Sequence, residues 1–225
     1  INHGVEGPTT DRMIRAVRSR QVKNMFATLM LSLGVPMMLG GDEMRRTQMG
    51  NNNAYCQDNA TSWFDWHLPE HHEEIFRFTK GMIALRKRHP CLRHARWLDE
   101  GWRNSRGLAQ IAWHGLELDD PGFDDPFARA MAFTLGGADH EADLHVMINM
   151  YVEPLSFALP PLAKRRWARV VDTALESPDD LVEAGHEIPI DDERYLVSPR
   201  SLVVLVSGHA KRRPRPVLEP WPDWD

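Results

Sequence analysis

Carboxylate and amide side chains gather in one short part of this chain. Asp42 and Glu43 closely follow a brief apolar run over residues 35–39, and residues 50–59 form the polar segment Gly-Asn-Asn-Asn-Ala-Tyr-Cys-Gln-Asp-Asn. Side-chain amides both donate and accept hydrogen bonds, which suits the hydroxyl groups of a sugar, and a tyrosine can stack on an apolar sugar face. The candidate ligand-binding residues are therefore Asn51, Asn52, Asn53 and Tyr55.

The adjacent carboxylates Asp42 and Glu43 are the next candidates, because paired carboxyl groups can cleave a glycosidic bond. Cleavage with retention needs the two groups about 5–5.5 Å apart across one bond. Neighbouring residues that leave a strand point to opposite faces, so this pair is poorly placed to flank one linkage. We expect both carboxylates to hold the loop through its amides and Arg45 or Arg46, and we assign no catalytic residue in this chain.

Hydrophobic spacing predicts the elements that position this loop. A helix is predicted over residues 11–33, with Thr9 or Thr10 as its N-cap and Gly34 as its stop. The apolar run over residues 35–39 then predicts a buried parallel strand that opens onto the polar loop, as in an α/β barrel. The apolar stripe of the helix comprises Ile14, Val17, Gln21, Met25, Leu29 and Leu33.

A second helix is predicted over residues 69–89. Pro69 suits the first turn of a helix, acidic residues follow it, and Pro90 ends the pattern after a run of basic residues. The apolar stripe of this helix comprises Ile75, Phe78, Met82 and Leu85.

The pattern changes after Pro90 to short runs that alternate apolar with polar residues, which predicts an antiparallel β-sandwich. A domain boundary is expected near residues 90–96. The last stretch, from residue 211, is rich in proline and predicts an extended tail. The predicted strands cover residues 110–116, 128–135, 144–150, 155–159, 166–171 and 202–206.

Composition narrows the class of protein. The chain has 225 residues, of which 42% are hydrophobic and 26% charged, and its formal net charge is −5. This mild acidity argues against nucleic acid or an anionic membrane as the main partner. Cys56 and Cys91 lack metal-ligand spacing, so we expect free thiols and a cytoplasmic location. The chain begins at Ile1 without a methionine, which suggests a piece of a longer protein.

Two further patterns leave alternatives open. Trp63 and Trp66 suit either a platform for glucan or packing of the loop onto the second helix, and packing is preferred because large aromatic side chains dominate core burial. His71 and His72 are adjacent and have no second ligand at helical spacing. We therefore expect no metal site and no cofactor.

Several motifs together resemble the isoamylase-type glycogen debranching enzymes of the α-amylase superfamily. The most specific is the loop Asn51-Asn52-Asn53-Ala54-Tyr55. The resemblance covers about residues 1–207. Its other motifs are residues 2–9, Gly34-Val35-Pro36-Met37, Gly41-Asp42-Glu43, Trp63-Phe64-Asp65-Trp66, Trp113-His114-Gly115, Phe157 with Leu159-Pro160, Asp172-Thr173 and Arg200-Ser201.

The resemblance implies the last βα units of a (β/α)₈ barrel over residues 1–92, a C-terminal antiparallel β-sandwich over 93–209 and a Pro-rich tail over 210–225. It implies hydrolysis of the α-1,6-glucosidic branch linkages of glycogen or limit dextrin. The catalytic carboxylates of the family would precede Ile1, so we expect the isolated chain to be inactive. Asn51, Asn52, Asn53 and Tyr55 would then lie on the rim of the substrate cleft.

Other readings of the function remain open. The amides of the loop could simply hold its shape, and the chain could act as a noncatalytic glucan-binding or structural module. A trehalose-forming or trehalose-releasing relative fits the loop less well. A single barrel strand with two helices leaves edges and apolar stripes exposed, which predicts self-association. The sandwich, at about 110 residues, is long enough to fold by itself. The oligomeric state is not predicted.

Overall fold

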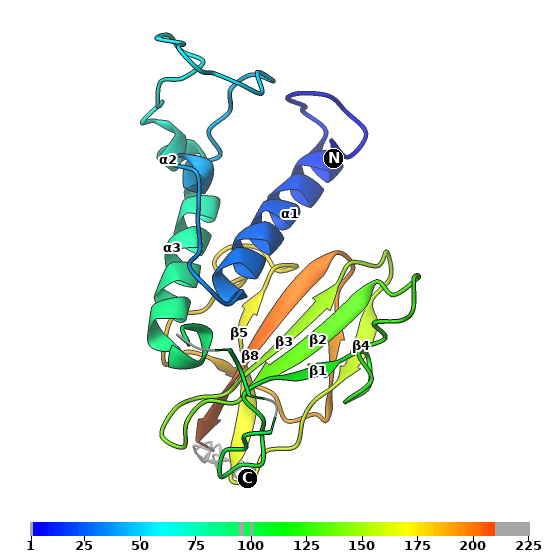
Figure 1. The fold of residues 1–225 in the computed structure, drawn as a ribbon. Coiled ribbons are helices and arrows are strands. Elements are labelled where there is room, and N and C mark those ends of the chain that lie inside the picture. Colours follow the sequence, from blue (N-terminus) through cyan, green and yellow to red (C-terminus); the bar gives the residue numbers. More distant parts are fainter. Residues whose placement is uncertain (1, 95–96, 100, 210–225) are drawn as a thin grey trace, which may run out of the picture.

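The computed structural model describes residues 2–94, 97–99 and 101–209, so the predicted tail over 210–225 lies outside the described residues. Two long helices lie on one face of a six-stranded antiparallel sheet (Figure 1). A two-stranded sheet packs on the opposite face of the six-stranded one, with a separate set of buried side chains between them. The predicted antiparallel sheet structure is therefore present.

Helix α1 spans Arg12–Leu31 and begins at an aspartate rather than at the predicted threonines. The Asp11 carboxylate accepts hydrogen bonds from the backbone N–H groups of Met13 (2.8 Å) and Ile14 (3.1 Å), which makes Asp11 the N-cap. The predicted apolar stripe is wrong, since Met25 is 70% exposed. The residues that α1 buries are Lys23, Asn24, Phe26, Ala27, Met30 and Leu31.

The second predicted helix is present in two parts, α2 at Leu68–His71 and α3 at Glu73–Arg88. The break falls at His72, whose backbone leaves the helical region with φ of −126°. The predicted stripe of α3 is confirmed, because Ile75, Phe78, Met82 and Leu85 are all buried. A short 3₁₀ turn, Pro90–Leu92, follows the helix.

All six strands predicted after Pro90 form, and two short ones were missed. The missed strands, β6 at Ile188–Pro189 and β7 at Arg194–Val197, carry a proline and a charged start that hide a strand pattern. The order in the larger sheet is β1-β2-β3-β8-β5-β6, and β4 pairs with β7. The remaining strands are β1 (Ala112–His114), β2 (Ala130–Leu135), β3 (Leu144–Asn149), β4 (Leu155–Ala158), β5 (Arg165–Asp172) and β8 (Ser201–His209).

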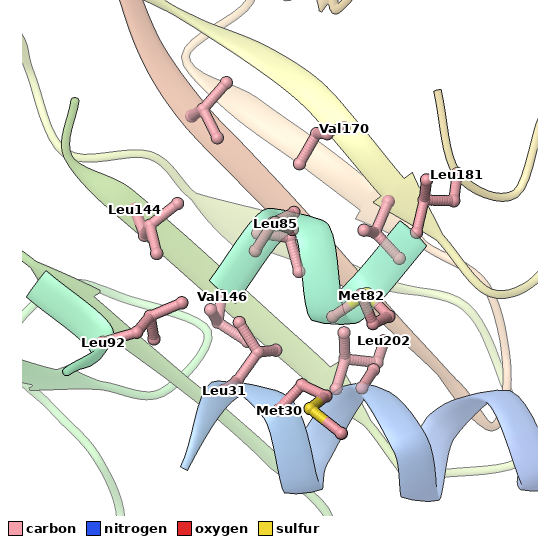
Figure 2. Close-up of a cluster of buried hydrophobic side chains, with 14 of the residues drawn as sticks. Met30, Leu31, Met82, Leu85, Leu92, Leu144, Val146, Val170, Leu181 and Leu202 are labelled. Atoms are coloured by element: carbon pink, nitrogen blue, oxygen red, sulfur yellow. The ribbon is translucent and has the colours of Figure 1, made fainter. Parts of the chain in front are cut away.

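Strand β8 contributes to both hydrophobic cores because alternate side chains point to opposite faces of a sheet. Leu202, Val204 and Val206 belong to the core beneath the helices, whereas Val203 and Leu205 belong to the core beneath the two-stranded sheet. Figure 2 shows the first core, in which Met30, Leu31, Met82 and Leu85 of the helices meet Leu144, Val146 and Leu202 of the sheet.

Polar contacts lock α1 to the sheet. The Thr173 hydroxyl donates to the side-chain oxygen of Asn24 (2.6 Å) and accepts from the backbone N–H of Leu202 (2.8 Å). The amide nitrogen of Asn24 donates to the carbonyl oxygen of Arg200 (2.9 Å). These buried groups satisfy one another, so the helix is fixed in register against β8.

The predicted buried strand over residues 35–39 is not formed. This segment has no regular secondary structure, and Val35 and Met37 are 95% and 88% exposed. A central parallel strand takes its hydrogen bonds from a strand on each side. No described residue supplies such a neighbour, which is the physical reason for the error.

The described residues include no helix that is both long and apolar enough to cross a membrane. They also hold no group of three or more His, Cys, Asp or Glu side chains that could bind a metal ion. Both cysteines are free thiols, with Cys56 exposed and Cys91 buried.

Candidate functional site

The loop over residues 41–67 carries the predicted ligand-binding residues and is organised by Arg46. The Arg46 guanidinium donates to the carbonyl oxygen of Ser62 (2.8 Å) and lies 4.9 Å from the ring centroid of Phe64. Its backbone N–H donates to the carbonyl oxygen of Gly41 (2.9 Å). One residue therefore ties the start of the loop to its end, through its backbone and its side chain. Figure 1 shows the loop (cyan) at the end of the helices away from the sheet.

Gly41 allows this arrangement because its backbone is left-handed, with φ of +100°. A Cβ atom at this position would lie 2.7 Å from the Arg46 side chain. The 3₁₀ turn Asp42–Met44 follows, and the Glu43 carboxylate accepts a hydrogen bond from the Gly41 N–H (2.9 Å). Partial burial, together with the charge of Glu43, raises the pKa of Asp42.

Glu43 thus holds a loop amide, as predicted, but neither arginine binds these carboxylates through a hydrogen bond. Arg46 reaches Ser62, and the Arg45 guanidinium donates to the Ser19 hydroxyl of α1 (3.1 Å). The expected role of these carboxylates in bracing the loop is therefore confirmed only for Glu43, which acts through a backbone N–H group.

The structure divides the four predicted binding residues into two kinds. The side-chain oxygens of Asn51 and Asn53 accept hydrogen bonds from the backbone N–H groups of Asn53 (2.9 Å) and Tyr55 (3.1 Å), which are local turns. The side chains of Asn52 and Tyr55 are exposed and make no hydrogen bond to any described residue, and Tyr55 is 81% exposed. The first two residues shape the loop, and whether the last two contact a ligand stays a prediction.

The tryptophans of the loop are exposed, so the prediction that they pack as core onto the second helix is wrong. Trp63 is 60% exposed and donates its indole N–H to the Asp58 carboxylate (2.9 Å). Trp66 is 75% exposed and stacks on Phe64 with ring centroids 5.7 Å apart. Exposed aromatic rings in the same loop as an unpaired amide suit a ligand with apolar faces and many hydroxyl groups.

A second concentration of polar residues, not predicted from the sequence, lines a cleft between α1, the start of α3 and residues 173–177. Its basic side chains include Arg12, Arg15 and Arg45. The available signal was the spacing of two or three residues between basic positions in the first half of α1, with no acidic residue after Asp11 to balance them.

Comparison with known proteins relates the part of the chain that forms the two sheets to a known domain family. Residues 108–206, which hold β1 to β7 and most of β8, match the family model described as Isoamylase, C-terminal. This part of the chain is therefore similar to the C-terminal domain of isoamylases.

Curated relatives extend the similarity beyond the isoamylase C-terminal domain. Isoamylase 3, chloroplastic, of Oryza sativa is 35% identical over 206 residues, which cover 91% of this chain and 24% of that protein. The isoamylase of a Flavobacterium species is 35% identical over 205 residues (86% and 26%). The glycogen operon protein GlgX homolog of Mycobacterium tuberculosis is 44% identical over 140 residues (60% and 19%). The chain thus spans about a quarter of these relatives or less, and it is related to the C-terminal portion of debranching enzymes.

Solved structures share the fold. Pullulanase from Bacillus acidopullulyticus matches with a TM-score of 0.62 and 21% identity over 89% of this chain and 21% of its own. Pullulanase type I from Bacillus subtilis, complexed with maltose, matches with a TM-score of 0.61 and 19% identity over 85% and 24% of the two chains. The helices and sheets of this chain therefore adopt a fold also found in pullulanases.

Proposed function

We propose that this chain is the C-terminal part of an enzyme that hydrolyses α-1,6-glucosidic branch linkages in glycogen or limit dextrin. The names of the relatives support debranching, and the match over residues 108–206 supports a C-terminal position. In this proposal residues 1–92 complete a (β/α)₈ barrel, 93–209 form the trailing β-sandwich, and the protein works in the cytoplasm. The catalytic carboxylates lie in barrel strands that precede this chain.

The exposed run over residues 35–39 is consistent with this proposal. Its apolar side chains suit the eighth strand of a barrel, and in the proposed enzyme the strands on each side would supply the missing hydrogen bonds. The loop over residues 41–67 would then emerge at the catalytic end of the barrel, because active sites of barrel enzymes lie beyond the carboxyl ends of the strands.

The observation that carries the proposal is the exposure of Tyr55, Trp63 and Trp66 in the same loop as Asn52, whose amide has no hydrogen-bond partner among the described residues. Exposure of several large aromatic rings to water indicates that a ligand or a partner covers them. Sugars suit this role because they offer both apolar faces and hydroxyl groups. We assign Tyr55 and Asn52 to direct contact with the glucan, and Asn51 and Asn53 to the shape of the loop.

The test is to replace Tyr55 by Ala in the complete gene product and to measure release of linear maltooligosaccharides from glycogen. We expect kcat/KM to fall by about tenfold, since loss of one sugar-stacking ring costs about 1–2 kcal/mol, with an unchanged melting temperature. Tyr151→Ala, at a half-exposed tyrosine beside the sheet, is the control and leaves kcat/KM unchanged. Unchanged kinetics for Tyr55→Ala would remove this residue from the site.

A noncatalytic glucan-binding module is the second candidate, and the same exposed rings favour it because binding alone requires no carboxyl pair. The complete gene product separates the two, because only a debranching enzyme releases linear maltooligosaccharides from glycogen. Both candidates predict the same behaviour for the 225-residue chain. We expect it to bind maltohexaose weakly, with a change in tryptophan fluorescence, and to release no sugar from glycogen. Hydrolysis by this chain would contradict the placement of the catalytic carboxylates outside it.

A further inference from the structure

The basic cleft between α1, the start of α3 and residues 173–177 has a volume of about 810 Å³. Two carboxylates, Glu74 and Glu176, line it together with a larger number of permanently charged bases. The basic residues are Arg12, Arg15, Arg18, Arg20, Lys23 and Arg45. The lining therefore carries a large excess of positive charge in a concave surface, where low-dielectric walls strengthen attraction for an anion.

Three of these bases are already engaged by the fold. Lys23 is buried and forms ion pairs with Glu74 (3.2 Å) and Asp180 (2.7 Å). The Arg18 guanidinium donates to the carbonyl oxygens of residues 2 and 7, and Arg20 donates to the carbonyl oxygen of residue 199. These three side chains build the walls of the cleft.

The other three bases, Arg12, Arg15 and Arg45, form no ion pair within 4 Å with any carboxylate of the described residues. Arg12 and Arg15 are exposed on the same stretch of α1. Arg45 is half-buried, and its guanidinium donates a hydrogen bond to the Ser19 hydroxyl of α1 (3.1 Å). The hydroxyl of Ser19 in turn donates to Glu74 (2.8 Å), so the position of Arg45 is fixed before any ligand arrives.

Other positive charges lie near Arg45 in the cleft. Burial lowers the pKa of Arg45, and the nearby charges of Arg15 and Arg18 lower it further, against the opposing effect of Glu74. A preorganised group of like charges is unfavourable until an anion enters, and guanidinium groups match the oxygens of phosphate through paired N–H donors.

We propose that this cleft is a binding site for a phosphate-bearing anion, held by Arg12, Arg15 and Arg45. A dianion balances the excess charge better than a single carboxylate does. The volume also exceeds what one phosphate group fills, so a phosphate ester of a sugar fits the space better than inorganic phosphate. This inference does not depend on the proposed function, since the cleft involves none of the residues assigned to the glucan.

The test uses the 225-residue chain and isothermal titration with inorganic phosphate, glucose 6-phosphate and glucose in low-salt buffer. We expect saturable binding of both phosphates, with the ester tighter, and none of glucose. Arg15→Gln combined with Arg45→Gln weakens binding by about tenfold or more, because two charge-assisted contacts are lost. Equal affinities for the two phosphates would assign the site to the free ion rather than to the ester.

The matched control is Lys80→Gln, which removes one exposed positive charge from α3 outside the cleft. We expect this variant to bind as the wild type does, and all variants to keep the far-ultraviolet circular dichroism of the parent. The proposal is overturned by absence of saturable phosphate binding, or by equal loss of affinity in the Lys80 variant, which would indicate only nonspecific attraction.

Discussion

At the scale of single residues, two buried histidines are joined through a threonine within the sheet. The backbone N–H of Asp119 donates to Nδ1 of His114 (2.9 Å), so His114 is neutral, and its Nε2 lies 3.0 Å from the Thr134 hydroxyl. That hydroxyl lies 2.9 Å from Nδ1 of His145. The Nε2 atom of His145 is buried and has no hydrogen-bond partner among the described residues.

Burial lowers the pKa of both histidines, to about 3 for His145, where the proximity of His114 adds to the effect. The unfolded chain takes up these protons near a pKa of about 6.5, whereas the folded chain does not. The contribution to stability is therefore complete above about pH 6.5 and is lost as the pH falls toward the folded pKa values.

We predict that the free energy of unfolding declines between pH 6.5 and 4, by up to about 1.4 kcal/mol per pH unit for each such histidine. His145→Gln should flatten this slope, which urea titrations at several pH values will measure. His140→Gln is the control, because the side chain of His140 is 85% exposed. An unaltered slope in the His145 variant would contradict the prediction.

At the scale of elements, a buried carboxylate fastens both long helices to the segment after β5. Asp180 is fully buried and lies 2.7 Å from Nζ of Lys23 on α1. It also pairs with Arg77 on α3, whose guanidinium donates to the carbonyl oxygen of Leu181 (3.0 Å) as well. The carboxylate therefore compensates a buried ammonium group and links three separate parts of the chain.

We predict that Asp180→Asn lowers the free energy of unfolding by about 3 kcal/mol, because Lys23 keeps its charge in a buried place with only Glu74 nearby. Denaturation in urea at pH 7 measures this loss. Asp191→Asn, which breaks the exposed pair with Arg166 (3.0 Å), should change stability by about 0.5 kcal/mol or less. Similar losses in the two variants would show that burial of Asp180 is not decisive.

The elements that could be predicted from the sequence are those whose burial is signalled locally. The stripe of α3 and the six main strands show clear periodicity, and they form as predicted. The buried face of α1 was missed because it includes Lys23 and Asn24, two polar residues. Their partners lie far away in sequence; Thr173, for example, is 149 residues from Asn24. A local sequence pattern does not predict such contacts.

The candidate loop was predictable only where its contacts are local in sequence. The motif located the loop, and the alternative that its amides hold its shape is correct for Asn51 and Asn53, whose hydrogen bonds are local. The exposure of Trp63 and Trp66 was not predictable, because a large aromatic side chain is usually buried. The basic cleft depends on α1, Arg45 and residues 173–177 meeting in space.

At the scale of the whole molecule, the described surface carries several large apolar side chains near the end of α1. Met25, Leu33, Val35, Met37 and Leu39 are all more than 40% exposed. Large apolar side chains exposed in such number within one short segment favour contacts between copies of the chain.

We predict that the purified chain self-associates with rising concentration, and that Val35→Lys combined with Met37→Lys reduces this association. Light scattering coupled to size-exclusion chromatography measures the mass at each concentration. Leu196→Lys serves as the control, since Leu196 is 65% exposed on the two-stranded sheet, away from α1. A wild-type mass that stays monomeric throughout would refute the prediction.

Strand β8 has no face turned to solvent, since Leu202 and Val204 support the helices while Val203 and Leu205 support the small sheet. Cutting the chain near residue 92 would not produce two independently stable parts. The sheet without the helices would expose to water the apolar face that the helices cover. We therefore expect the helices and the sheets to melt in one cooperative transition, as a single unit of stability.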